Sequence, residues 1–170
     1  MTTAKSKALF LAGLLWAATA IVHSQETDIP NRGEPLDGII TGGQPSAAAI
    51  ATIAEQGFTA VIDLRSVEED RGFDEAATVQ GLGMSYISLP VSGAGGISYE
   101  NANALDAILA DIDGPVLVHC ASSNRVGALL ALRAKLNGAD DEEALALGVD
   151  AGLTGLRPVV EEVLSTSPVQ

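Results

Sequence analysis

Cysteine is almost absent from this chain of 170 residues, since Cys120 is the only one. A single cysteine excludes an intramolecular disulfide. A lone cysteine is often a small buried hydrophobic residue, so this interpretation of Cys120 stays open until its neighbours are considered.

Basic residues are also scarce, because nine lysines and arginines face 22 acidic residues and give a formal net charge of −13. This charge argues against nucleic acid and anionic membrane surfaces as partners, although a small anion can bind wherever an arginine and backbone amides converge. Histidine is equally rare, and one of the two, His23, lies in the N-terminal segment. Too few soft ligands remain for a metal site, so we expect no metal and no other cofactor.

The N-terminal segment, residues 1–24, predicts a signal peptide. Lys5 and Lys7 supply the positive charge, residues 8–22 are apolar, and small residues near Ser24 fit a cleavage site. A membrane anchor is the alternative, but the apolar run is shorter than the roughly 20 residues that span a bilayer. The signal predicts an exported, periplasmic protein that has no membrane contact once the segment is removed.

The remaining chain has the size of one domain. Residues 25–37 are polar, lack apolar periodicity and predict an extended lead-in, and residues 38–170 form the expected domain. Strands are expected at 39–41, 59–64, 84–89 and 116–119, and helices at 47–56, 74–81, 98–111, 126–137, from 140 onward and 156–165. This alternation predicts an α/β fold with a small, mostly parallel sheet of four to five strands flanked by helices.

Polar side chains follow several of the expected strands. Gln44, Asp63, Ser92 and Cys120 each come shortly after one of them. Ligands of open α/β sheets bind outside the carboxyl ends of the strands, so we expect these residues to share one edge.

Cys120 is followed by a short loop and by Arg125 at the start of a helix. The helix N-terminus, the guanidinium and the loop amides each favour a thiolate. The same groups would bind a tetrahedral oxyanion against the sulfur atom, which points to a nucleophile.

Three segments carry a resemblance to a known family: Thr-Gly-Gly-Gln-Pro-Ser at 41–46, Thr-Ala-Val-Ile-Asp-Leu-Arg at 59–65, and Val-His-Cys-Ala-Ser-Ser-Asn-Arg-Val-Gly-Ala at 118–128. They resemble the bacterial phosphatase-like domain that is also fused to beta-lactamase-hydrolase-like proteins. This group is similar to the cysteine-dependent protein tyrosine and dual-specificity phosphatases. The resemblance covers residues 40–164 and implies a phosphotyrosine-phosphatase-like fold with a phosphate-binding loop.

The resemblance also implies roles. Cys120 would attack a phosphate monoester, on a small molecule or a phosphoprotein, and form a phosphocysteine; Arg125 would hold two phosphate oxygens. His119 and Gln44 would position the loop, and Asp63 is the best-placed candidate for a general acid. The substrate-binding loop would consist of Ala121, Ser122, Ser123, Asn124 and Arg125.

Several residues depart from the family pattern. Ser123 stands where glycine is usual and would be strained at a positive φ. Val126 replaces a hydroxyl residue that assists breakdown of the intermediate. The loop of residues 91–97 contains no carboxylate where phosphatases of this kind carry their acid. Slow turnover and a preference for good leaving groups are the expected result.

The other carboxylates have alternative interpretations. Asp63 would also suit an ion pair with Arg65, and residues 68–70 are typical of a solvated acidic surface.

Two other functions stay open. Asp63, Arg65 and Glu69 resemble an early segment of rhodanese-type sulfurtransferases, although no Gly-His-Ile segment follows. The missing acid, Ser123 and Val126 also fit a module that binds phosphate without turning it over. The sequence leaves the oligomeric state open.

Overall fold

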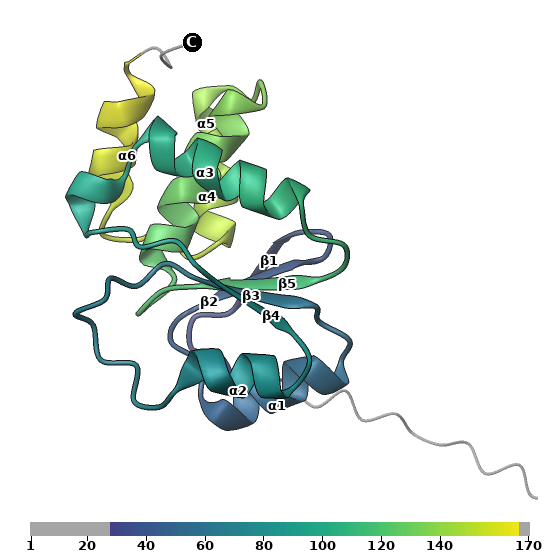
Figure 1. The fold of residues 1–170 in the computed structure, drawn as a ribbon. Coiled ribbons are helices and arrows are strands. Elements are labelled where there is room, and N and C mark those ends of the chain that lie inside the picture. The colour runs from purple at the N-terminus through teal and green to yellow at the C-terminus, as the bar shows by residue number, and fades with distance from the viewer. Residues whose placement is uncertain (1–27, 167–170) are drawn as a thin grey trace, which may run out of the picture.

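The computed structural model describes residues 28–166, and the predicted signal peptide at 1–24 lies outside the described residues. These residues form three layers, with a five-stranded sheet between two layers of helices (Figure 1). Within residues 28–166, no helix is long and apolar enough to cross a membrane. The predicted α/β class, with a small and mostly parallel sheet, is confirmed.

The sheet has the strand order β1-β2-β5-β3-β4. Its strands are β1 (Gly33–Leu36), β2 (Ile39–Gly42), β3 (Ala60–Asp63), β4 (Ser85–Ser88) and β5 (Val116–His119). All neighbours pair in parallel except β1, which is antiparallel to β2. β5 is central and buried at every position, as its continuous apolar run predicts.

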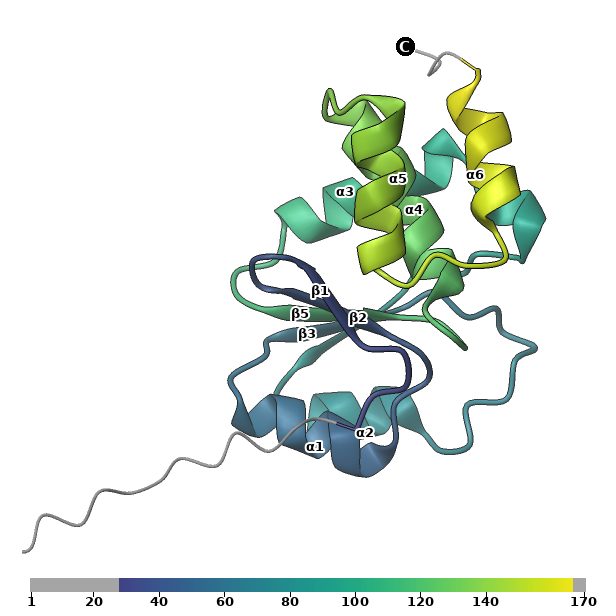
Figure 2. The same cartoon turned by 180° about the vertical axis from the view of Figure 1, so that it is seen from behind.

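Helices cover both faces of the sheet (Figures 1 and 2). One face carries α1 (Ala47–Glu55) and α2 (Glu75–Gly81). The other carries α3 (Tyr99–Ala110), α4 (Asn124–Leu136), α5 (Asp141–Asp150) and α6 (Arg157–Leu164), and a short 3-10 turn spans Ala94–Gly96. α4 is buried at eight consecutive positions, from Arg125 to Leu132, because it lies between the sheet and the other helices. The loop that precedes α4 is therefore attached to a fully buried strand and to a helix with a long buried segment.

The expected lead-in needs a correction, because part of it belongs to the sheet. β1 lies within residues 25–37, and Asp37 and Gly38 form the turn to β2, with Gly38 at a φ of +75°. An Asp-Gly pair between two strands is a hairpin signal. The Pro30 carbonyl accepts a 2.6 Å hydrogen bond from the Gly43 N–H, and the Asn31 amide donates to the Ser122 carbonyl at 3.3 Å. Residues 30–36 thus support the sheet and the loop after Cys120.

Candidate active site

The loop from Cys120 to Arg125 joins β5 to α4 and is held by the neighbouring strand. The Cys120 N–H donates to the Gly42 carbonyl at 3.2 Å, and the Gln44 N–H donates to the Ala121 carbonyl at 3.2 Å. The Gln44 side chain donates to the Arg71 carbonyl at 2.9 Å. Gln44, expected to position the loop, thus lies between it and the segment after β3.

Ser123 has the positive φ that the sequence analysis identified as a source of strain. Its φ is +68°, and its hydroxyl turns away from α4 to donate to the Ala151 carbonyl at 2.8 Å. The serine therefore forms no side-chain cap on α4. The first N–H groups of α4 stay available to an anion, because a helix leaves these donors without partners.

Asn124 connects the loop to the C-terminal part of the domain. Its side-chain oxygen accepts hydrogen bonds from the N–H groups of Thr154, at 2.9 Å, and Leu156, at 3.3 Å. Asn124, a residue of the expected substrate-binding loop, therefore also has a structural contact through its side chain.

Cys120 is 1% exposed and lies at the edge of the larger apolar core. This burial fits both interpretations of the residue, the packed hydrophobe and the nucleophile at the floor of a site. Its position near Arg125 favours the nucleophile, because the charge of Cys120 contributes to the raised pKa of Arg125.

Arg125 is held by a bidentate contact with Glu69. Its two terminal nitrogens donate to the two Glu69 oxygens at 2.6 and 2.7 Å. The Nη1 atom also donates to the carbonyls of Val91, at 2.9 Å, and Leu64, at 3.4 Å. These contacts leave the Nε and Nη2 edge as the part of the guanidinium that can still take an oxyanion.

The ion pair between Glu69 and Arg125 shifts the pKa of each side chain toward its charged form. The hydrogen bonds from Arg125 lower the pKa of Glu69 despite its partial burial, and the hydrogen bonds to Glu69, together with the charge of Cys120, raise the pKa of Arg125. The Ser66 N–H donates to Glu69 at 2.7 Å and fixes the carboxylate further. Glu69 is therefore a partner of the loop arginine, which corrects the expectation of a solvated surface for this residue, whereas Glu68 and Asp70 are exposed as expected.

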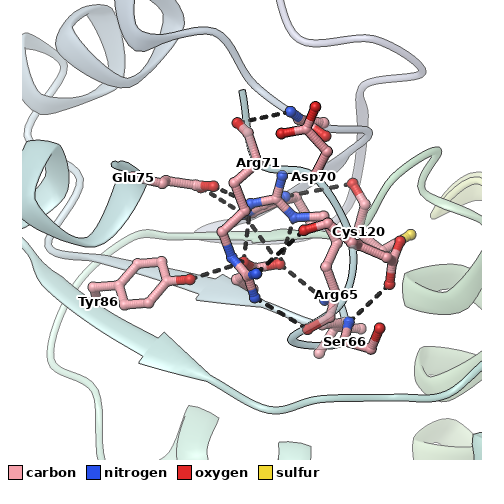
Figure 3. Close-up of polar contacts among 12 residues, drawn as sticks. Arg65, Ser66, Asp70, Arg71, Glu75, Tyr86 and Cys120 are labelled. Atoms are coloured by element: carbon pink, nitrogen blue, oxygen red, sulfur yellow. Dashed lines mark hydrogen bonds and ion pairs between the residues drawn. The ribbon is translucent and has the colours of Figure 1, made fainter. Parts of the chain in front are cut away.

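Asp63 lies at the carboxyl end of β3, as expected, but is fully buried. It accepts hydrogen bonds from Arg65 at 2.8 and 2.9 Å, from Tyr86 at 2.8 Å and from Arg71 at 3.2 Å (Figure 3). Burial alone would raise the pKa of Asp63, but the hydrogen bonds from Arg65 and Tyr86 and the interaction with His119 outweigh it and hold the pKa far below its ordinary range. The structure therefore has the ion pair with Arg65, and an ionised Asp63 has no proton to give to a leaving group.

His119 faces a carboxylate that the sequence analysis missed. Its Nε2 lies 2.8 Å from Glu75 of α2 and 3.9 Å from Asp63, and its Nδ1 lies 3.4 Å from the Cys120 carbonyl. Glu75 also contacts the Arg65 guanidinium. The pattern at α2 contained a signal, because Glu75 shares its buried face with Val79, one turn along.

Asp63, Glu75 and His119 offer three atoms at metal-ligand spacing. The Arg65 guanidinium contacts both carboxylates, so a cation from the chain already compensates their charge. Figure 3 shows Glu75 of this cluster directed toward Arg65, and the cluster connects His119, the residue before Cys120, to β3 and α2.

An open pocket of about 590 Å³ lies over the loop. It is lined by Ser66, Glu68 and Glu69 after β3, by Ser92 and Gly93 after β4, by Ser122, Asn124 and Arg125 of the loop, and by Leu156. Of the four residues expected at this edge, Ser92 lines the pocket, together with Ser122 and Arg125 of the loop, whereas Gln44, Asp63 and Cys120 are not among its lining residues.

The fold is shared with solved structures of phosphatases. A candidate phosphatase from Neisseria meningitidis superposes with a TM-score of 0.67 over 78% of this chain and 96% of the other, at 18% identity. TpbA of P. aeruginosa, crystallised as a cysteine-to-serine variant with phosphotyrosine, gives 0.55 over 83% and 93%, at 18% identity. At these identities the similarity shows a protein-tyrosine-phosphatase-like fold.

The sequence identifies the family within this class. Residues 38–139 match the phosphatase-like domain of beta-lactamase hydrolase-like proteins, and the chain belongs to this family. A beta-lactamase hydrolase-like protein of Xylella fastidiosa is 34% identical over 119 residues, which is 65% of this chain and 27% of the relative. One of Agrobacterium fabrum is 32% identical over 100 residues, which is 56% of this chain and 23% of the relative. The chain thus spans about a quarter of the length of these relatives.

Proposed function

We propose that this domain is a cysteine-dependent phosphatase that hydrolyses phosphate monoesters through a phosphocysteine. One observation carries the proposal: Cys120, the open edge of Arg125 and the uncapped N-terminus of α4 meet in a single loop. A phosphate dianion needs this combination of a bidentate cation and backbone donors.

In the first step the Cys120 thiolate attacks phosphorus, and the bond from phosphorus to the leaving oxygen breaks. Arg125 and the loop amides hold the equatorial oxygens as charge develops. Water then attacks phosphorus, the S–P bond breaks, and the thiolate and inorganic phosphate return. Asp63 is ionised and buried, so the leaving oxygen takes its proton from water and esters with good leaving groups react fastest.

Sulfur transfer is the second candidate, supported by the position of Asp63, Arg65 and Glu69 in sequence. In the structure the carboxylates of this motif have different partners: Asp63 forms an ion pair with Arg65, and Glu69 forms one with Arg125. The contact from Glu69 to the loop arginine suits oxyanion binding in either reaction.

A paired assay on one preparation separates the candidates. We expect hydrolysis of 4-nitrophenyl phosphate and no thiocyanate from thiosulfate and cyanide. Thiocyanate without phosphate release would favour a sulfurtransferase, and the absence of both products together with saturable phosphate binding would favour a module that only binds. The proposed location is the periplasm, and the signal at 1–24 is its only support.

A further inference from the structure

The charges around the pocket indicate which phosphate esters it accepts. Arg125 is the only cation among the residues that line the pocket within the described chain, and Glu69 already neutralises it through two hydrogen bonds. The thiolate that the proposed reaction requires adds a negative charge. A phosphate dianion therefore enters a site whose only side-chain cation is already compensated, and the backbone N–H groups of the loop and of the α4 N-terminus supply the remaining attraction.

Glu68 adds a further negative charge to the pocket. It is exposed, lines the same pocket and forms no ion pair within residues 28–166. Its charge therefore faces whatever the phosphate carries with it, in contrast to the charge of Glu69, which is directed at Arg125.

The rest of the lining offers little other selectivity. Of the lining residues, Leu156 is the only large apolar one, and none is aromatic. An aromatic leaving group has no ring to stack against, so charge is the strongest remaining distinction between esters that reach Cys120.

We propose that the domain prefers phosphate monoesters that carry an ammonium or guanidinium group near the phosphate, with Glu68 as the residue that binds this cation. The proposal rests on the phosphatase function proposed above. The net charge of −13 adds long-range attraction for such substrates and repulsion for polyanions.

The test uses three phenyl phosphates, substituted at the meta position with aminomethyl, hydroxymethyl or carboxymethyl, and compares their kcat/KM values after correction for the pKa of each leaving phenol. We expect kcat/KM to decrease in that order, with about a tenfold difference between the cation and the anion, the size expected for one exposed carboxylate. The preference should shrink in 1 M salt, because the Debye length falls to about 3 Å.

Glu68→Gln identifies the residue. The variant should lose rate on the aminomethyl ester and gain rate on the carboxymethyl ester, two opposite changes that a general loss of structure would not produce. The matched control is Glu55→Gln, at the end of α1 on the opposite edge of the sheet, which should keep the wild-type order.

Each outcome has one meaning. Hydrolysis of all three esters at equal kcat/KM would overturn this inference and leave the phosphatase function intact. An equal loss on all three in Glu68→Gln would also overturn it and would indicate a proton donor instead. If no ester is hydrolysed, the phosphatase function and this inference both fail.

Discussion

Ser123 stands in the left-handed region of the backbone map, where glycine has no penalty and serine does. The hydroxyl compensates by donating to the buried Ala151 carbonyl, which ties the loop to the end of α5. Ser123 thus combines a strained backbone with a long-range hydrogen bond. Because its hydroxyl is used in that bond, the N–H groups at the N-terminus of α4 have no side-chain cap.

Two substitutions at Ser123 separate the cost of the positive φ from the contribution of the hydrogen bond to Ala151. Ser123→Ala keeps the strain and loses the hydrogen bond, so we expect the free energy of unfolding to fall by about 1–3 kcal/mol. Ser123→Gly also loses the bond but regains about 1 kcal/mol from the relaxed backbone. Urea denaturation should therefore rank wild type above glycine and glycine above alanine, and a glycine variant less stable than the alanine variant would contradict this account.

Asp63 contributes stability as the buried anion that compensates Arg65. Asp63→Asn should lower the free energy of unfolding by about 3–5 kcal/mol at pH 7, because it leaves the Arg65 cation buried with less compensation. The pKa of the folded carboxyl lies below the ordinary value of 3.8, so its stabilisation is complete above that value and disappears as pH falls below it.

The pH dependence of the free energy of unfolding tests whether folding lowers the pKa of Asp63. The stability difference between wild type and Asp63→Asn, measured by urea denaturation, should be widest at pH 7 and narrower at pH 3. The exposed residue Asp113 supplies the control, since Asp113→Asn should change stability little at either pH. A gap that widens in acid would show that Asp63 is protonated in the folded protein.

At the scale of elements, the segment between β3 and the start of α2 completes the loop after β5. It contributes Glu69 to Arg125, and Glu75 to His119. Arg71 crosses this segment, with hydrogen bonds to Asp63 and to the Glu69 carbonyl at 3.4 Å. The segment after β3 and the region around the loop after β5 are far apart in sequence, and ion pairs join them in the fold.

Removal of the Glu69 carboxylate tests this link. Glu69→Ala frees the guanidinium to rotate, so we expect kcat/KM for 4-nitrophenyl phosphate to fall about tenfold through loss of orientation. Inhibition by inorganic phosphate should weaken in parallel, and Glu55→Ala should leave both unchanged. Tighter phosphate inhibition in Glu69→Ala would instead mean that Glu69 competes with phosphate for Arg125.

At the scale of the whole molecule, the central strands and the loop were predictable because their signals are local. The buried runs of β3 and β5 are continuous, and Cys120 and Arg125 are near neighbours in sequence. The hairpin to β1 was missed although Asp37 and Gly38 carry its turn signal.

The carboxylate partners were harder to predict, because no local pattern assigns partners across the chain. Glu69 lies 56 positions from Arg125, and Glu75 meets His119 only once α2 packs on the sheet. Asp63 was placed correctly at a strand end, but its burial under Tyr86 and Arg71 depends on β4 and on the segment that follows β3.

Oxyanion binding also depends on the planar fork of Arg125. Arg125→Lys keeps the charge but loses the bidentate geometry, so we expect inhibition by phosphate to weaken about tenfold or more. An unchanged inhibition constant would contradict the proposed geometry of the loop.

The most direct test of the central claim is Cys120→Ser, with turnover and anion binding measured on the same preparation. We expect hydrolysis of 4-nitrophenyl phosphate to disappear while calorimetric binding of inorganic phosphate is retained, because Arg125 and the loop amides remain. Wild-type turnover in Cys120→Ser would remove Cys120 as the nucleophile and contradict the proposed mechanism.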